Sequence, residues 1–99
     1  MYGSIFRMWP KQGREDELIG LMDEWERDMR PHVPGVVASY VVRPDNAPDQ
    51  LVGVAVFEDR ESYRANAESP EQDAWYRRMR DCLESDPEWQ DGEFIGAWH

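Results

Sequence analysis

Two neighbouring segments of this chain are rich in β-branched residues and apolar on both faces, and this pattern restricts the fold more than any other feature. Val36–Arg43 and Leu51–Phe57 are joined by a linker that contains two prolines and two aspartates, so they predict a β-hairpin. The two faces of the second segment are formed by Val52, Val54 and Val56 on one side and by Leu51, Ala55 and Phe57 on the other. A strand that is apolar on both faces is expected to be buried on both faces.

The start of the chain predicts a strand followed by a helix. Tyr2–Trp9 is aromatic and branched, and it ends at Pro10, which cannot donate a hydrogen bond to a sheet. Apolar residues then recur at spacings of three and four, the period of one helical face: Leu18, Leu21 or Met22, Trp25 and Met29. Pro31 and Pro34 end this helix, because the residue before a proline disfavours the helical conformation.

The end of the chain predicts two helical segments and one more strand. Asp59 is placed to cap a short helical stretch. A second helix is expected from the cap, first-turn and capping-box positions occupied by Ser69, Pro70 and Gln72. Glu93–Trp98 predicts the fourth strand, and the acidic stretch 86–93 before it predicts a solvated turn.

The order strand, helix, strand, strand, helix, strand predicts an α+β fold of the ferredoxin-like βαββαβ type. Residues 1–99 then form a single domain, with one four-stranded antiparallel sheet and two helices on one of its faces. The other sheet face stays bare in such a monomer, although the central strands are apolar on both sides. A second copy packed sheet to sheet would cover it, so we expect a homodimer.

Charge and cysteine content exclude several classes of partner. The chain carries 21 acidic and 11 basic side chains, for a formal charge of -10, which repels phosphate backbones and anionic lipids. We therefore expect neither nucleic acid nor a membrane as a partner. A single cysteine and two histidines provide neither a disulfide nor a cysteine/histidine metal site, and the chain begins without the features of a signal peptide, so a cytoplasmic protein is expected.

One segment carries a resemblance to a known family. Phe57–Pro70, with Trp75 following, resembles the region between the third strand and the second helix of the antibiotic biosynthesis monooxygenase family, whose members are dimeric α+β barrels. The order of predicted elements matches that family over essentially the whole chain. The resemblance therefore implies a dimeric α+β barrel and, with it, a pocket between the sheet and the second helix.

The better-known members of that family are oxygenases that need no cofactor, so the resemblance implies a monooxygenase of this type acting on a small aromatic or quinol-like compound. The residues expected to serve catalysis are Asn66, Tyr63 and Trp75, and those expected to bind substrate are Tyr40, Tyr76, Arg7 and His32. In the family a histidine often stands where Asn66 stands here, so the obvious acid/base group is missing.

Each candidate residue also has a structural alternative. Asn66 could cap or bend a helix near Pro70, and the aromatic candidates Tyr63 and Trp75 could serve the core or the dimer contact. His32 could be a surface histidine, and Arg7 could either hold an anionic substrate or pair with an acid across the dimer. The sequence leaves these alternatives open.

Two other functions share the predicted fold. A non-catalytic module could use the same pocket to bind a small aromatic ligand. The haem-degrading branch of the superfamily uses a histidine on the second helix as its iron ligand, whereas Trp75–Arg80 contains none and offers only Tyr76 or Met79 in its place. Haem binding is therefore the weaker of these alternatives, and no cofactor is expected.

Overall fold

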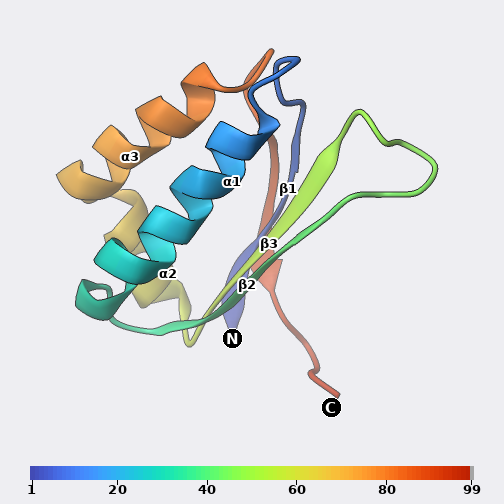
Figure 1. Cartoon of the computed structure of the whole chain (residues 1–99). Helices are drawn as coiled ribbons and strands as arrows, with labels where there is room; N and C mark the ends of the chain where they lie inside the picture. The colour runs from blue at the N-terminus through green and yellow to red at the C-terminus, as the bar shows by residue number, and fades with distance from the viewer. Residues whose placement is uncertain (99) are drawn as a thin grey trace.

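One antiparallel sheet, with its strands in the order β2-β3-β1-β4, forms the base of the molecule (Figure 1). The structure is a computed structural model and describes residues 1–98. The strands are β1 (Tyr2–Met8), β2 (Val36–Val42), β3 (Leu51–Phe57) and β4 (Glu88–Glu93), and the helices are α1 (Glu15–Glu24), α2 (Arg60–Ala67) and α3 (Pro70–Asp81). A π-helical segment (Trp25–Met29) and a 3-10 turn (Arg30–His32) continue α1. The predicted ferredoxin-like α+β fold is confirmed.

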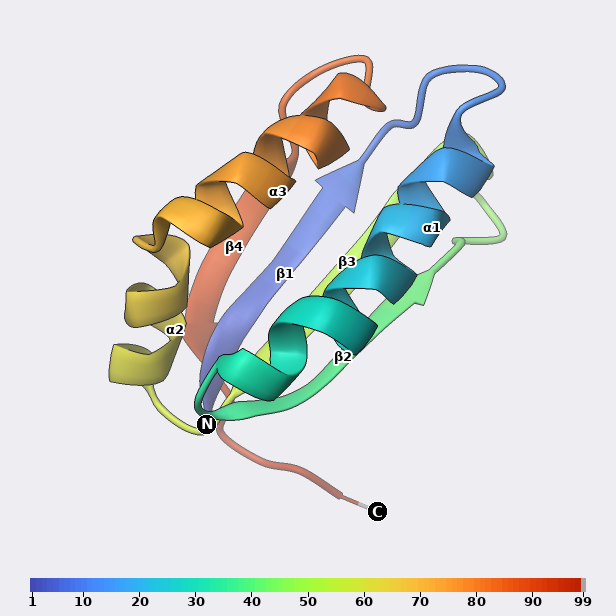
Figure 2. The same cartoon turned by 60° about the vertical axis from the view of Figure 1, so that its left-hand side comes forward.

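All three helices lie on the same face of the sheet (Figure 2). Side chains alternate along β1, so that Phe6 and Met8 are buried beneath the helices whereas Ile5 and Arg7 are exposed on the opposite face. Gly53 lies opposite Phe6 in the sheet, and a Cβ atom at that position would overlap the Phe6 ring. The fully buried side chains of the core are Met8, Leu18, Met79, Cys82 and Leu83.

The starts of α2 and α3 follow the predicted capping residues. Asp59 Oδ1 accepts a hydrogen bond of 2.7 Å from the Ser62 backbone N–H. Ser69 Oγ accepts one of 3.0 Å from the Gln72 backbone N–H. The side chain of Gln72 does not complete a capping box, because its Oε1 accepts a hydrogen bond of 2.7 Å from Trp25 Nε1. The π-helical segment after α1 is thereby tied to the first turn of α3.

The fourth strand lies earlier in the chain than predicted. β4 spans Glu88–Glu93, so the prediction of a strand over Glu93–Trp98 and of a solvated turn over 86–93 was wrong. Its register pairs Glu93 with Tyr2, the first residue of β1, and residues beyond Glu93 therefore run past the end of the neighbouring strand. Phe94 N–H still donates to the Met1 carbonyl at 2.9 Å, and the ladder ends there.

The sheet face opposite the helices is partly apolar and open. Ile5 is 45% exposed, Tyr40 64% and Val42 58%, and the register places all three on this face beside the valines of β3. None of the described helices combines the length and apolar character needed to cross a membrane.

Candidate functional site

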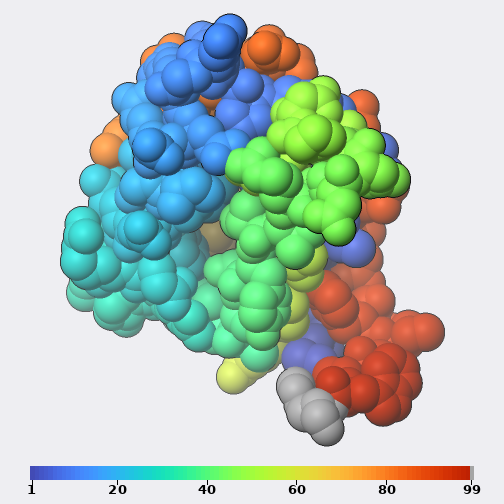
Figure 3. Space-filling model, turned by 45° about the vertical axis from the view of Figure 1, so that its right-hand side comes forward, coloured from blue at the N-terminus to red at the C-terminus, as the bar shows by residue number. Residues whose placement is uncertain are grey.

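A cavity of about 480 Å³ lies between the helices and the sheet. Its walls come from α1 and the π-helical segment on one side, from α2 and α3 on the other, and from all four strands. Figure 3 shows a hollow in the surface between α1, in blue to cyan, and β2, in green. Eight of the lining residues are aromatic: Phe6, Trp25, Tyr40, Phe57, Tyr63, Trp75, Tyr76 and Trp89. An apolar, aromatic cavity with few polar groups is typical of a small-molecule site.

Asn66 contributes one of these few polar groups. It lies near the end of α2, is half-buried, and lines the cavity. Its Oδ1 atom is buried and has no hydrogen-bond partner among the described residues. The side-chain oxygen therefore does not cap a helix, which was the structural alternative for this residue. A buried amide without a partner is costly, and it is the kind of group that a bound ligand would satisfy.

Tyr63 lies on the same helix, one turn before Asn66, and its hydroxyl donates a hydrogen bond of 2.9 Å to Asp91 Oδ1 on β4. Burial raises the pKa of Tyr63 from its usual 10.0 to about 12, and the neighbouring Asp91 carboxylate adds to the rise. The Ser4 hydroxyl, on the sheet side of the phenol, lowers the Tyr63 pKa and offsets part of this rise. Tyr63 is therefore protonated at neutral pH and serves as a hydrogen-bond donor rather than as a base.

Ser4 is the most deeply buried polar side chain at the cavity. It projects from β1 and is only 2% exposed. Its Oγ lies near the Tyr63 phenol but makes no hydrogen bond of regular geometry within residues 1–98. In the sheet it lies directly opposite Ala55 on one side and Asp91 on the other. Ser4 and Asn66 thus present two unsatisfied polar atoms to the same cavity.

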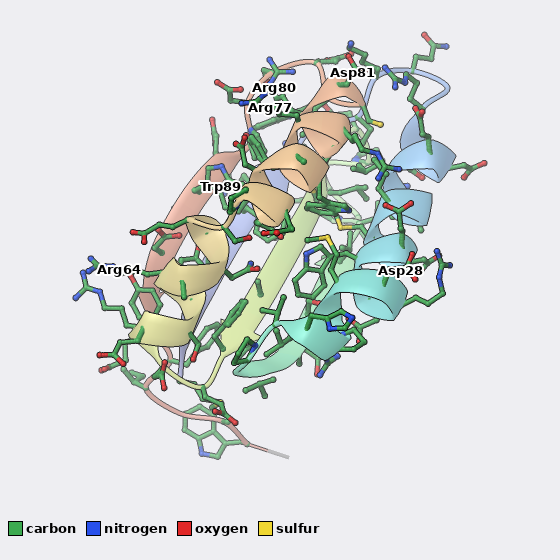
Figure 4. The ribbon with its side chains drawn as sticks, turned by 90° about the vertical axis from the view of Figure 1, so that its left-hand side faces the viewer. Asp28, Arg64, Arg77, Arg80, Asp81 and Trp89 are labelled. Carbon is green, nitrogen blue, oxygen red and sulfur yellow. The ribbon has the colours of Figure 1, made fainter. Side chains whose placement is uncertain are left out.

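The aromatic walls are held in place by contacts of their own. Trp75 is 8% exposed, and its Nε1 donates a hydrogen bond of 2.9 Å to the Leu21 carbonyl, so its polar atom is already used. Tyr76 is half-buried, and its ring lies 6.2 Å from that of Trp89, which in turn lies 4.7 Å from Phe6. Figure 4 shows Trp89 between β4 and α3. Trp75 and Tyr76 therefore both line the cavity, and their rings are held there by these contacts.

Two of the predicted substrate-binding residues, Arg7 and His32, lie away from the cavity, and a third, Tyr40, lies only at its edge. Tyr40 borders the cavity at the β2 edge, but its register opposite Val54 directs its side chain to the open sheet face. Arg7 is exposed on that same open face, between Val52 and Glu88 on the neighbouring strands, and is not part of the cavity wall. His32 is exposed in the 3-10 turn, also away from the wall. The structure therefore brings Asn66, Tyr63, Trp75 and Tyr76 together, and it separates Arg7 and His32 from them.

Four residues of the site were missed by the sequence analysis: Ser4, Gln72, Trp89 and Asp91. Ser4 shares the inward face of β1 with Phe6 and Met8, and this alternation is the one sequence signal that could have pointed to it. Trp89 and Asp91 lie in the stretch that the sequence predicted to be a turn. Their common position on the inward face of β4, opposite Phe6 and Ser4, was therefore not predicted.

The described residues contain no group of three or more His, Cys, Asp or Glu side chains placed to hold a metal ion. Tyr76 and Met79, the two residues considered as iron ligands, both border the cavity, but Met79 is 1% exposed within the core. What the arrangement offers chemically is an aromatic cavity with an amide, a hydroxyl and a protonated phenol on its walls, and with four carboxylates at its border.

Comparisons with known proteins agree with this architecture. No curated protein sequence matches the chain. Among solved structures, a proposed antibiotic biosynthesis monooxygenase from Chloroflexus aurantiacus J-10-fl is 23% identical, with a TM-score of 0.76 over 99% of this chain and 96% of that one. A protein of unknown function from Nitrosomonas europaea is 17% identical, with a TM-score of 0.77 over 99% of this chain and 92% of its own.

A third structure is SnoaB from Streptomyces nogalater, a cofactor-independent oxygenase in a form that carries an asparagine-to-alanine substitution. It is 14% identical to this chain, with a TM-score of 0.81 over 97% of this chain and 94% of its own. At these identities the structures establish the fold alone. The sequence model of the antibiotic biosynthesis monooxygenase family matches residues 1–78, most of the chain. The chain therefore belongs to the antibiotic biosynthesis monooxygenase family.

Proposed function

We propose that this protein is a cofactor-independent monooxygenase that oxidises a small aromatic compound of the quinol or anthrone type in the cavity beside Asn66. The observation that carries the proposal is the buried Asn66 Oδ1, which has no partner in the described chain and lines an aromatic cavity of about 480 Å³. Family membership and the likeness to SnoaB, itself a cofactor-independent oxygenase, support the same reaction class.

The substrate itself supplies the electrons in this reaction. The phenol, or the enol form of an anthrone, gives its proton to the buffer, and the resulting anion gives an electron to O₂. The substrate radical and superoxide combine to form a C–O bond, and protonation gives a hydroperoxide whose O–O bond breaks as water leaves. For an anthrone, the CH₂ group becomes C=O, one oxygen atom of O₂ enters the product and the other leaves as water. The protein then needs to bind the ring, stabilise the phenolate and exclude bulk water.

The cavity residues fit these tasks. Asn66 Oδ1 would accept a hydrogen bond from the phenol O–H of the bound substrate. Once that proton has left, rotation of the amide would present Nδ2 as a donor to the substrate oxygen, which then carries negative charge. The unpartnered Ser4 hydroxyl is a second donor on the sheet side of the cavity. Tyr63, protonated at neutral pH, positions Asp91 through their hydrogen bond. The walls formed by Trp75 and Tyr76 would hold a flat ring by stacking.

Oxygen consumption tests the proposal directly. The purified protein is mixed with a panel of quinols and anthrones in a buffer that contains a metal chelator, and O₂ uptake is followed with an electrode. We expect uptake above the rate without protein for at least one ring system, with one O₂ consumed per anthrone. Uptake at the protein-free rate across the panel would contradict the proposal.

A non-catalytic binding module is the second candidate, and one observation favours it. No histidine or lysine lines the cavity within residues 1–98, and the Tyr63 phenol is protonated near pH 7, so the lining lacks the histidine that most often serves as a general base. If ring compounds quench the fluorescence of the cavity tryptophans but no O₂ is consumed, the cavity binds its ligand without oxidising it.

We also propose that two copies of the chain pair through the open faces of their sheets. The chain exposes 6721 Å², whereas a compact monomer of its mass exposes about 5,900 Å². The excess of about 800 Å² is shared between the extended tail after β4, where Ile95 is 94% and Trp98 88% exposed, and the open sheet face. Ile5, Tyr40 and Val42 would form its apolar centre, since they are exposed on this face.

A further inference from the structure

The rim of the cavity is acidic. Four carboxylates border the cavity, all of them on exposed residues: Asp23, Glu26, Asp73 and Asp91. They come from three different sides, because two lie on α1 and the π-helical segment that follows it, one lies on α3 and one on β4. Within residues 1–98 no lysine, arginine or histidine is part of the cavity lining. An opening surrounded by one sign of charge concentrates ligands of the opposite sign.

Arginine side chains near the rim compensate only part of this charge. Arg30 forms an ion pair with Glu26, and Arg77 forms one of 3.0 Å with Asp73. Asp23 forms no ion pair in the described part of the chain, and Asp91 accepts its hydrogen bond from the uncharged Tyr63 phenol. Figure 4 shows Arg64 and Arg77 projecting outward from α2 and α3. Asp23 and Asp91 therefore form no salt bridge within residues 1–98. The cation nearest to Asp23 along the chain, Arg27 in the π-helical segment, forms its salt bridge with Asp28 and acts on Asp23 only through space.

The interior below this rim suits an aromatic cation. The rings of Trp25, Trp75, Tyr76 and Trp89 surround the space, and the negative face of such a ring attracts an ammonium group. Deeper still, Ser4 is 2% exposed and keeps an unpartnered hydroxyl at the cavity wall, a polar atom that a ligand can satisfy. A ligand that is already anionic in solution would meet carboxylates at the entrance, which costs free energy with no cation in the lining to offset it. A quinol or anthrone enters uncharged and loses its proton only inside the cavity, so this cost does not apply to its entry.

We infer that the cavity selects an aromatic compound that carries a protonated amine, with its ring between the aromatic walls and its ammonium group at the Asp23 side of the rim. This inference rests on the proposed use of the cavity as the ligand site, and it names the substrate class for that site. It does not depend on whether the bound compound is then oxidised.

Three probes that share one ring system and differ in charge test the inference. They are naphthalen-1-ylmethylammonium, naphthalen-1-ylmethanol and naphthalen-1-ylacetate, and their dissociation constants are measured by calorimetry at pH 7 and low salt. We expect the cation to bind on the order of fivefold more tightly than the neutral alcohol, and the anion to bind most weakly. In 1 M salt the preference should largely disappear, because charges are then screened over about 3 Å.

A pair of matched variants locates the effect. Asp23→Asn removes a rim carboxylate and should lower the affinity for the cation by about threefold while leaving that for the alcohol unchanged. Asp45→Asn removes the same charge from the exposed linker between β2 and β3, which is not part of the cavity lining, and should change neither affinity. Equal affinities for cation and alcohol, tighter binding of the anion, or no binding of any probe would overturn the inference.

Failure of the inference and failure of the proposed function give different results. If the cation is preferred but no quinol or anthrone consumes O₂, the charge selectivity stands and the oxygenase proposal falls. If O₂ is consumed but the three probes bind equally, the oxygenase proposal stands and the charge selectivity falls.

Discussion

Asn66 is the residue at which function and stability are expected to oppose each other. Its buried Oδ1 lacks a partner, so the folded chain carries the cost of removing that atom from water without the gain of a hydrogen bond. Ser4 carries a similar cost at its hydroxyl. Groups of this kind persist where a ligand satisfies them, since the protein alone gains nothing from them.

Replacement of Asn66 by alanine should therefore not destabilise the protein. We expect the free energy of unfolding of Asn66→Ala to be unchanged or higher by up to about 1 kcal/mol, because an unsatisfied amide is removed and alanine is the better helix former. Urea denaturation at one fixed protein concentration measures this. A loss of more than about 1 kcal/mol would instead assign the side chain a structural role.

Tyr63 should make stability depend on pH in the alkaline range. Its pKa is about 12 in the folded protein and near 10.0 in the unfolded chain. Between these values the folded state keeps a proton that the unfolded state has lost, so the free energy of unfolding falls as the pH rises. Below about pH 10 both states are protonated, and this contribution is fully present.

Tyr63→Phe isolates that contribution. Denaturation midpoints of the two proteins, measured from pH 9 to pH 12, should fall less steeply in the variant than in the wild type. Parallel pH dependence in both proteins would show that the phenol does not titrate differently on unfolding.

At the scale of single residues the sequence predicted part of the site. Tyr63, Asn66 and Trp75 were chosen from the family resemblance, helical spacing placed them on inward faces, and all three line the cavity. Their roles in catalysis stay predictions. Arg7 shows the limit of this approach, because alternation on a strand tells which residues share a face but not which face the helices cover. His32 follows the helix end, where no periodicity fixes a direction.

At the scale of elements, the start of α3 depends on a single side chain. Ser69 Oγ caps the helix through the Gln72 N–H, and this first turn also carries the Gln72 side chain that holds Trp25 at the cavity. Ser69→Ala should lower the free energy of unfolding by about 1 kcal/mol. Ser85→Ala is the matched control, since Ser85 is exposed and lies outside the helices and strands. Equal stability of the two variants in urea would argue against the cap.

The elements whose ends are marked by caps and prolines were predicted well, whereas β4 was not. Its sequence, Glu88–Glu93, contains one aromatic residue among polar ones. All six residues are exposed, so no apolar face marks the segment as a strand. What makes it a strand is its pairing with β1 and the packing of Trp89 on Phe6. Both are contacts between distant parts of the chain, which local patterns do not contain.

At the scale of the whole molecule, the open sheet face predicts the oligomeric state. Light scattering at micromolar concentration should give twice the 11.7 kDa mass of one chain. Val54→Glu places a charge at the centre of that face, opposite Ile5 and Tyr40, and should yield monomers, because an unpaired charge would be buried in the interface. Gln12→Glu adds the same charge in an exposed turn and should remain dimeric. A wild-type mass of one chain would contradict the proposed dimer.

The turnover of Asn66→Ala on an anthrone or quinol that the wild type oxidises tests the central claim most directly. Loss of one hydrogen-bond donor to a developing oxyanion should lower kcat about 100-fold. Asn46→Ala makes the same chemical change in the exposed linker between β2 and β3 and should keep the wild-type kcat. If Asn66→Ala, folded and binding the same ring compound, turned over as fast as Asn46→Ala, the cavity beside Asn66 would not be the site of oxidation.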